Sequence, residues 1–213
     1  MEIGTYPLEK TSIFQGADAQ QVQKMLGVIL PSIKTYVRGE TICRAGETVS
    51  SLGIVLAGGA TIELCDAWGN RSIIERLEPG EAYACLPGEP LMVSVTADAP
   101  TRVMFLGVSR MLSMGLEPEQ AILTTNLLRI MARKNVTLSQ RMMNISARTI
   151  RARLLSYLSQ QAIRTGSSRF TIPFNRQELA DYLGVERSAL SAQMSKMKEE
   201  GLIDYRKNAF EVL

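Results

Sequence analysis

Basic and polar side chains near the C-terminus have the types and spacing of a surface that reads DNA. Between residues 186 and 199, Leu190, Met194 and Met197 fall on one side of a predicted helix. The remaining positions are polar or small: Arg187, Ser188, Ser191, Ala192, Gln193 and Lys196. Guanidinium, hydroxyl and amide groups form hydrogen bonds with base edges. The spacing therefore predicts a helix whose polar side can enter a DNA major groove.

Another short helix is predicted immediately before this one. Asn175 and Glu178 have the spacing of a capping box at its start, and Gly184 suits its C-terminal end. The two helices have the order of a helix-turn-helix, an order that ordinary helical hairpins share.

The residues around this helix pair favour DNA binding. Residues 202–205 and 209–212 alternate like the strands of a hairpin, and the basic turn Arg206-Lys207-Asn208 joins them. Residues 170–172 predict a further strand ahead of the first helix. The complete order is that of a winged helix-turn-helix.

Residues 117–145 predict a long helix that pairs two copies of the chain. No glycine or proline follows Pro118 there, and one set of positions repeats at alternating intervals of three and four: Ala121, Thr124, Leu128, Met131, Asn135, Leu138, Met142 and Ile145. This is the seam of a coiled coil, in which a polar Asn135 fixes register and a two-stranded state. The alternative is that the stripe packs only on its own β domain. A second apolar flank between Ile122 and Ile130 allows the helix to do both.

Twofold pairing has a mechanical consequence for DNA recognition. It would place two recognition helices roughly 34 Å apart, one turn of DNA, and it predicts a palindromic operator. Residues 146–158 predict another amphipathic helix, whose apolar residues belong to the core of the DNA-binding domain. Ser146 is its expected cap, and residues 144–146 are the expected hinge.

The N-terminal half predicts a β domain. From residue 32 to residue 106, short runs rich in Val, Ile and Thr alternate with glycine-bearing turns, as in a barrel or roll, and residues 19–30 predict a leading helix. The expected fold is α+β. A β-roll of the double-stranded β-helix, cupin-like type spans residues 1–116, the dimerisation helix 117–145 and the winged helix-turn-helix 146–213.

Positive charge is concentrated in the part of the chain that is predicted to bind DNA. The formal net charge of the whole chain is only +3. Residues 146–213 hold 11 Lys and Arg against 7 Asp and Glu, whereas residues 1–116 hold 9 against 12. Because neutralisation of phosphates dominates non-specific affinity, the local excess favours DNA as a partner.

Composition argues against enzyme chemistry and against a membrane location. The chain has no histidine, which disfavours the usual catalytic triads, zinc sites and histidine-ligated haem. Cys43, Cys65 and Cys85 are scattered and odd in number, as expected of reduced and mostly buried thiols. No apolar run approaches the roughly 18 residues of a membrane span, and the first residues lack a signal-peptide layout. We expect a cytoplasmic protein without catalytic, metal or cofactor sites.

The order of β-roll, long helix and winged helix-turn-helix resembles the Crp/Fnr family of bacterial transcription regulators over essentially the whole chain. Several stretches carry the resemblance: Phe14-Gln15-Gly16, residues 36–42 with Ala45-Gly46-Glu47, residues 77–81, and residues 176–180 with Gly201-Leu202-Ile203. The resemblance implies a homodimeric sensor that binds a small signal in the roll and repositions its DNA-reading helices. It also implies RNA polymerase as a further partner.

The expected effector site departs from the pattern of the cyclic-nucleotide binders. Ala84-Cys85 occupies the place of their Gly-Glu pair, and the place of the phosphate-binding arginine falls near Leu91. Desolvation of a phosphate without a cationic partner is costly, so we expect no useful binding of cyclic AMP. The N-terminal cysteine cluster of the iron-sulfur sensors is also missing.

What remains at the effector site is an apolar pocket suited to an uncharged or aromatic ligand. Its expected lining comes from the roll and the long helix: Tyr83, Ala84, Cys85, Leu86, the residues 91–95 that begin with Leu91, and Thr124, Thr125 and Leu128. One alternative is that the roll binds nothing, and a weaker one is that Cys85 responds to a redox signal.

The family motif also assigns roles to the DNA-facing residues. Arg187 matches the arginine that reaches a guanine edge, a contact that discriminates by about 1–3 kcal/mol. Ser188 replaces the usual glutamate and Ala192 the second arginine, so the operator should differ from the usual one, with Ser191 and Gln193 adding polar or water-mediated readout. The expected phosphate contacts are Arg176, Gln177, Lys196, Arg206 and Lys207. The alternative function is a small-molecule-binding protein whose helix-turn-helix serves as a protein-interaction module.

Overall fold

The computed structural model describes residues 6–83, 88–113 and 118–213. The chain divides into two compact units, Met1–Gly69 with Glu75–Asn135, and Asn70–Ile74 with Val136–Leu213. This boundary falls inside the long helix, so the expected limits at residues 116 and 145 stay a prediction. Within the described residues, no helix combines the length and the apolar character that a membrane span requires.

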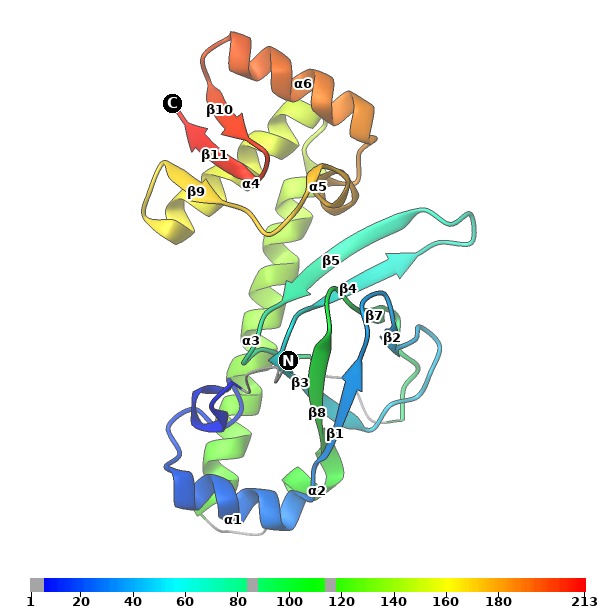
Figure 1. The fold of residues 1–213 in the computed structure, drawn as a ribbon, viewed down its shortest axis with the longest axis vertical. Helices are drawn as coiled ribbons and strands as arrows, with labels where there is room; N and C mark the ends of the chain where they lie inside the picture. Colours follow the sequence, from blue (N-terminus) through cyan, green and yellow to red (C-terminus); the bar gives the residue numbers. More distant parts are fainter. Residues whose placement is uncertain (1–5, 84–87, 114–117) are drawn as a thin grey trace. The chain divides into compact units, whose positions relative to one another are not determined.

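The first unit is built on a β-roll, as predicted. Its two antiparallel four-stranded sheets have the orders β1-β8-β3-β6 and β2-β7-β4-β5 (Figure 1). The strands are β1 Ser32–Tyr36, β2 Thr41–Cys43, β3 Ser51–Ala57, β4 Ala60–Cys65, β5 Arg71–Leu77, β6 Ala82–Tyr83, β7 Ser94–Ala97 and β8 Thr101–Gly107. The predicted span of residues 32–106 therefore agrees with the observed strands to within one residue.

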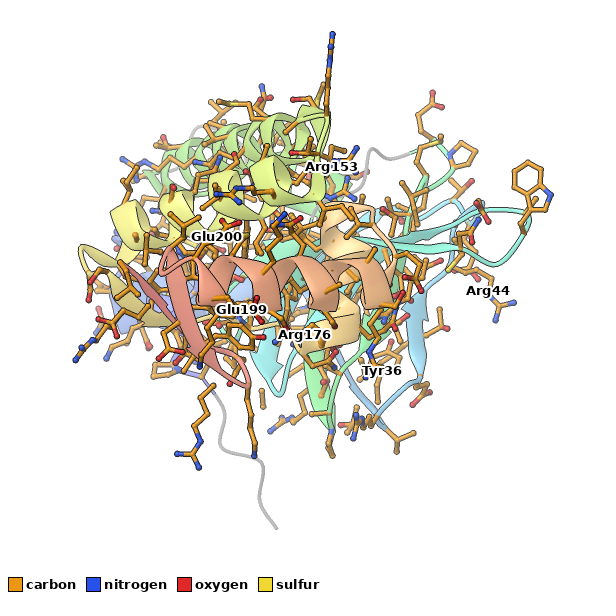
Figure 2. All side chains as sticks on the ribbon, turned by 90° about the horizontal axis from the view of Figure 1, so that it is seen from above. Tyr36, Arg44, Arg153, Arg176, Glu199 and Glu200 are labelled. Carbon is orange, nitrogen blue, oxygen red and sulfur yellow. The ribbon has the colours of Figure 1, made fainter. Side chains whose placement is uncertain are left out.

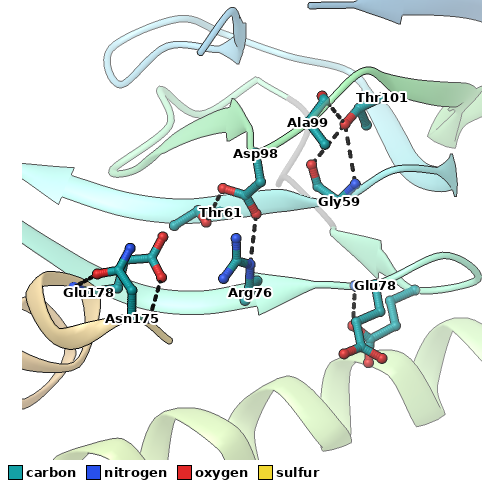
Figure 3. A network of polar contacts seen from close by, with 10 residues as sticks. Gly59, Thr61, Arg76, Glu78, Asp98, Ala99, Thr101, Asn175 and Glu178 are labelled. Carbon is teal, nitrogen blue, oxygen red and sulfur yellow. Dashed lines mark hydrogen bonds and ion pairs between the residues drawn. The ribbon is translucent and has the colours of Figure 1, made fainter. Parts of the chain in front are cut away.

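Tight turns and a polar network hold the second sheet of the roll. Gly58 has a φ of +79°, and a Cβ there would lie 2.4 Å from the carbonyl oxygen of Pro100, so only glycine fits. Asp98 accepts hydrogen bonds from Thr61 Oγ1 at 2.7 Å and from Arg76 Nε at 3.0 Å (Figure 3). This carboxylate thereby ties β4 and β5 to the turn that precedes β8.

Helices cover the core of the roll. The 3-10 helix η1 spans Leu8–Lys10, α1 Ala19–Ile29 and α2 Val108–Leu112. Helix α1 begins at a capping box between Asp18 and Gln21, and its buried residues Val22, Met25 and Ile29 join the apolar core of β3 and β8. The predicted leading helix over residues 19–30 is confirmed to within one residue.

The long helix α3 spans Pro118–Ser146 and has one face packed within its own chain. Leu123 and Ile130 are buried in the core of the roll. Between them, the amide of Asn126 donates to the carbonyl oxygens of Ile13 and Gln15 at 2.9 and 2.8 Å. These residues are the second apolar flank that the sequence predicts.

The connection between α3 and α4, which spans Ile150–Thr165, differs from the prediction. Ser146 belongs to α3, where its hydroxyl donates back to the carbonyl of Met143. The cap of α4 is Thr149, whose side chain accepts from the backbone N–H of Ala152 at 3.1 Å. Asn144, within the predicted hinge, is fully buried and helical. The expectation of a Ser146 cap and a hinge at residues 144–146 was wrong, because α3 continues to Ser146 and only residues 147–149 leave the helix.

The C-terminal part is a winged helix-turn-helix. Strand β9 covers Arg169–Thr171, α5 Arg176–Leu183, α6 Arg187–Glu199, β10 Ile203–Arg206 and β11 Ala209–Val212. The three strands pair in the order β10-β11-β9, with Tyr205 opposite Phe210 and Phe210 opposite Phe170. The strand predicted at residues 170–172 is shifted by one residue.

The second unit also includes a short piece of β5. Ile73 is buried in the same apolar cluster as Leu158, Leu179 and Leu183. Arg141 of α3 holds this piece, since its Nε donates to the carbonyl of Ile73 at 2.8 Å and its Nη2 to Ser72 Oγ at 2.7 Å.

Candidate nucleic-acid interface

The caps predicted for the helix pair are confirmed. The backbone N–H of Asn175 donates to Glu178 Oε2 at 2.8 Å, and the N–H of Glu178 donates to Asn175 Oδ1 at 3.0 Å (Figure 3). Gly184 ends α5 with a φ of +62°, in the left-handed region that favours glycine. The side chain of Glu186 then caps α6 by accepting from the N–H of Ala189 at 3.0 Å. Local side-chain bonds therefore define both the start of α5 and the start of α6.

Helix α6 has one buried and one exposed side. Leu190, Met194 and Met197 are completely buried in the domain core. The other positions reach solvent to different extents: Arg187, Ser188, Ala192 and Lys196 are exposed, and Ser191 and Gln193 are half-buried. The division of the helix agrees with the one predicted from the sequence.

The predicted base-reading residues differ in whether their side chains already have hydrogen-bond partners within the chain. Arg187 is exposed, and within the described residues its guanidinium has no hydrogen bond or ion pair. Ser188 donates its hydroxyl to Glu186, and Ser191 donates to the carbonyl of Arg187 at 2.9 Å. The pKa of Glu186 is lowered, and the hydrogen bond from Ser188 contributes most to this shift. The lowered pKa favours the ionised carboxylate at the start of α6. Arg187 is thus a base-reading candidate whose donors are all available to a ligand, unlike the hydroxyls of Ser188 and Ser191.

The predicted phosphate contacts fall into two groups. Lys196, Arg206 and Lys207 are exposed, and none of them has an ion pair within the part of the chain that the structure describes. Arg176, which is labelled in Figure 2, is in contrast partly buried. Its guanidinium lies over the ring of Tyr205, 5.0 Å from the centroid, and touches the sulfur of Met194. Burial is the main cause that lowers its pKa.

Gln177 also has a partner within its own helix. Its amide donates to Asp181 Oδ1 at 2.8 Å. The free cations of the interface therefore lie on α6 and on the wing, rather than at the start of α5.

Tyr205 packs at the centre of this region, a role that the sequence analysis did not predict. Besides Arg176, its ring has Lys198 Nζ 5.5 Å from the centroid, and it packs against Phe210 at 5.8 Å. Lys198 is held in turn by Asp204 at 2.5 Å, an exposed ion pair. The ring joins α5, α6 and the wing. The signal in the sequence is an aromatic residue directly before the basic turn.

The predicted effector pocket is only partly described. Ala84, Cys85 and Leu86 lie outside the described residues. Tyr83 is buried with its hydroxyl 3.4 Å from Cys43 Sγ, and its ring covers Gly53, where a Cβ would lie 2.2 Å from the ring. The backbone of Leu91 is held by hydrogen bonds, and its carbonyl oxygen accepts from the N–H of Gly46 at 2.7 Å.

The helix side of that pocket is open in the single chain. Thr124 is half-buried and accepts from Gln120 Nε2 at 3.2 Å, whereas Thr125 and Leu128 are exposed. Of the thiols, Cys43 is buried and Cys65 is exposed. Within the described residues, no three side chains of His, Cys, Asp or Glu form a group that could hold a metal ion.

The predicted coiled-coil seam is uncovered in the single chain. Four apolar residues of the seam remain 47–67% exposed: Leu128, Met131, Leu138 and Met142. Asn135 is exposed between them. The alternative that this stripe packs only on its own roll is therefore wrong, since the roll is contacted by the other flank.

Comparison with known proteins defines the class of protein to which this architecture belongs. Residues 33–116 match the family described as "Cyclic nucleotide-binding domain", and residues 152–213 match "Crp-like helix-turn-helix domain". The transcriptional activator protein FnrA of Stutzerimonas stutzeri is 27% identical over 175 residues, covering 78% of this chain and 70% of FnrA. FnrL of Cereibacter sphaeroides, also a transcriptional activator, is 22% identical over 94% of this chain and 83% of FnrL.

A solved structure supports the same fold. The regulator CLP of Xanthomonas campestris superimposes with a TM-score of 0.73 at 14% identity, covering 92% of this chain and 99% of CLP. A cyclic-nucleotide-binding-type roll and a Crp-like helix-turn-helix thus occur together on one chain. This chain belongs to the Crp/Fnr family of transcription regulators.

Proposed function

We propose that the chain acts as a cytoplasmic homodimeric regulator that binds a palindromic operator in double-stranded DNA. The observation that carries the proposal is Arg187, a free guanidinium at the start of a helix whose opposite side forms the domain core. A recognition helix of this kind presents its N-terminal residues to base edges. Lys196 on α6, together with Arg206 and Lys207 on the wing, adds exposed positive charge for phosphates.

The homodimer follows from the uncovered seam of α3. An apolar stripe that continues from Leu128 to Met142 at heptad spacing is unusual on a surface that remains in water. A second copy of the same helix buries it by placing each seam residue opposite its equivalent. Asn135 pairs with its equivalent and favours two strands in register. RNA polymerase is the further partner that we propose for such a regulator.

Selection of bound genomic fragments tests the proposed function. Fragments retained by the purified protein should share two inverted half-sites whose centres are about 10 base pairs, or a multiple of one DNA turn, apart. Affinity should fall steeply as salt is raised, because phosphate contacts release counterions. Absence of salt-dependent binding to any fragment would instead favour a small-molecule-binding protein that uses its helix-turn-helix to contact other proteins.

We propose an uncharged, apolar or aromatic effector for the roll. The proposal is supported by the residues that replace the phosphate cassette, Ala84-Cys85 and Leu91, which offer no cation to a cyclic phosphate. An apolar ligand loses little hydration on entering such a site, whereas an unpaired phosphate loses much.

Titration with cyclic AMP should therefore give no saturable binding. Calorimetry at micromolar protein, with cyclic AMP up to about a hundred times that concentration, should show only heats of dilution, since the phosphate lacks a charge partner. A family member that binds cyclic AMP serves as the positive control. A micromolar dissociation constant for this chain would contradict the proposed class of effector.

A further inference from the structure

Arg153 makes hydrogen bonds both to the connection between α3 and α4 and to the turn of the helix-turn-helix. It lies in the first turn of α4, and its guanidinium donates three hydrogen bonds, all to backbone carbonyls. Nε donates to Ala147 at 2.8 Å, and Nη1 donates to Leu183 at 3.1 Å and to Gly184 at 3.0 Å. The side chain of Arg153 is labelled in Figure 2. One planar group therefore joins the α3–α4 connection to the turn between α5 and α6.

The bonds on the turn side satisfy groups that helix geometry leaves without partners. The last carbonyls of an α-helix have no intrahelical donor, and they form the negative end of the helix dipole. Leu183 is the last residue of α5 and Gly184 its cap. A cation there is favourable, and it also fixes the backbone from which α6 starts three residues after Gly184.

The bond on the linker side reaches the non-helical segment that connects α3 to α4. Ala147 lies in the short non-helical stretch between Ser146 and Ile150. On either side of this stretch the helices are tied together, because the buried Asn144 accepts from Ser156 Oγ at 2.7 Å and donates to Gln160 at 3.1 Å. A change in the angle between α3 and α4 must therefore alter the backbone around Ala147.

We propose that Arg153 is a positioning residue for DNA reading, which couples the conformation of the α3–α4 connection to the placement of α6. The inference rests on the proposed function, since α6 is taken as the recognition helix. Arg153 does not touch the DNA in this role. Its fork of donors is essential, because a lysine provides a single charged centre that cannot bond Ala147 and the turn in the same geometry.

Two substitutions of Arg153 test the proposal, with a neighbour as the control. Arg153→Met keeps the apolar stem and removes every donor, and Arg153→Lys keeps only the charge. Arg151→Met removes an adjacent guanidinium whose partner is Glu200, an ion pair at the domain surface. The ratio of operator affinity to random-DNA affinity should fall about tenfold for Arg153→Met, because charge-assisted hydrogen bonds are lost from the turn. It should fall less for Arg153→Lys and stay unchanged for Arg151→Met.

Two further readouts separate positioning from other roles. The dependence of DNA affinity on salt concentration should match that of the wild type, since no phosphate contact is lost. If the slope of log affinity against log salt concentration falls by about one, Arg153 contacts a phosphate and the proposal is overturned. In the free protein, hydrogen exchange at the amide of Val185 should become faster in Arg153→Met, while the core amide of Leu158 keeps its protection. Exchange and discrimination equal to the wild type would also overturn it. If the wild type itself discriminates no DNA sequence, the proposed function fails, and the exchange at Val185 still decides whether Arg153 fixes the turn.

Discussion

Replacing Leu138 by glutamate is expected to convert the proposed dimer into monomers and to lower operator affinity by about 100-fold or more, because simultaneous binding of two half-sites is lost. Leu138 occupies the seam of α3 and is 47% exposed in the single chain, so the substitution leaves no cavity in the roll or in the DNA-binding domain. In the dimer, the two glutamates would lie next to each other across the twofold axis. Burial of two like charges opposes pairing.

Light scattering and operator titration measure this effect on the same samples. Gln140→Glu is the matched control, because it adds the same charge to an exposed position of α3 that lies outside the heptad seam. The control should remain dimeric with operator affinity close to that of the wild type. A Leu138→Glu protein that stays dimeric at micromolar concentration would show that two copies associate through another surface.

Local signals allowed the sequence to predict much of the DNA-binding domain. The capping box of Asn175 and Glu178 and the left-handed Gly184 involve residues within a few positions of each other, so their pattern suffices. The same holds for the buried side of α6, which follows from its periodicity. The seam and the roll-facing flank of α3 were separable because heptad spacing distinguishes one side of a helix from the other.

Contacts between distant residues were not predictable from such signals. The phosphate contact of Arg176 stays a prediction, but nothing in the sequence indicated that its guanidinium lies over Tyr205, which is 29 residues later and reaches it only when the wing folds back. Ile73 joins the core of the second unit from the β5 strand, and no periodicity in its own segment indicates that partner. Arg153 bonds Leu183, again across 30 residues.

The wrong cap at the linker has a different cause. Ser146 and Thr149 are both capping residue types, and they lie three positions apart. The choice between them depends on where α3 ends, and its last turn is stabilised by the buried Asn144, whose partners belong to α4. A tertiary contact therefore decides which hydroxyl caps the next helix.

Arg187→Ala is expected to weaken operator binding and to relax specificity at a single base pair of each half-site. A bidentate bond from a guanidinium to O6 and N7 of guanine discriminates by about 1–3 kcal/mol, which corresponds to a loss of about 5- to 150-fold. Arg187 has no internal partner in the described structure, so its removal should leave the stability of the domain unchanged. Binding to a library of operators substituted at every position measures the effect, and the preference should disappear at one symmetric pair of positions only.

Lys207 provides the contrast that makes this test decisive. It is exposed in the wing turn with a φ of 55°, a conformation that asparagine tolerates better than alanine, so Lys207→Asn removes the charge without straining the turn. This variant should weaken binding to operator and random DNA alike and reduce the slope of affinity against salt by about one, as the loss of a phosphate contact does. If Arg187→Ala instead lowers both affinities equally, its guanidinium contacts the backbone and the base-reading role belongs to another residue of α6.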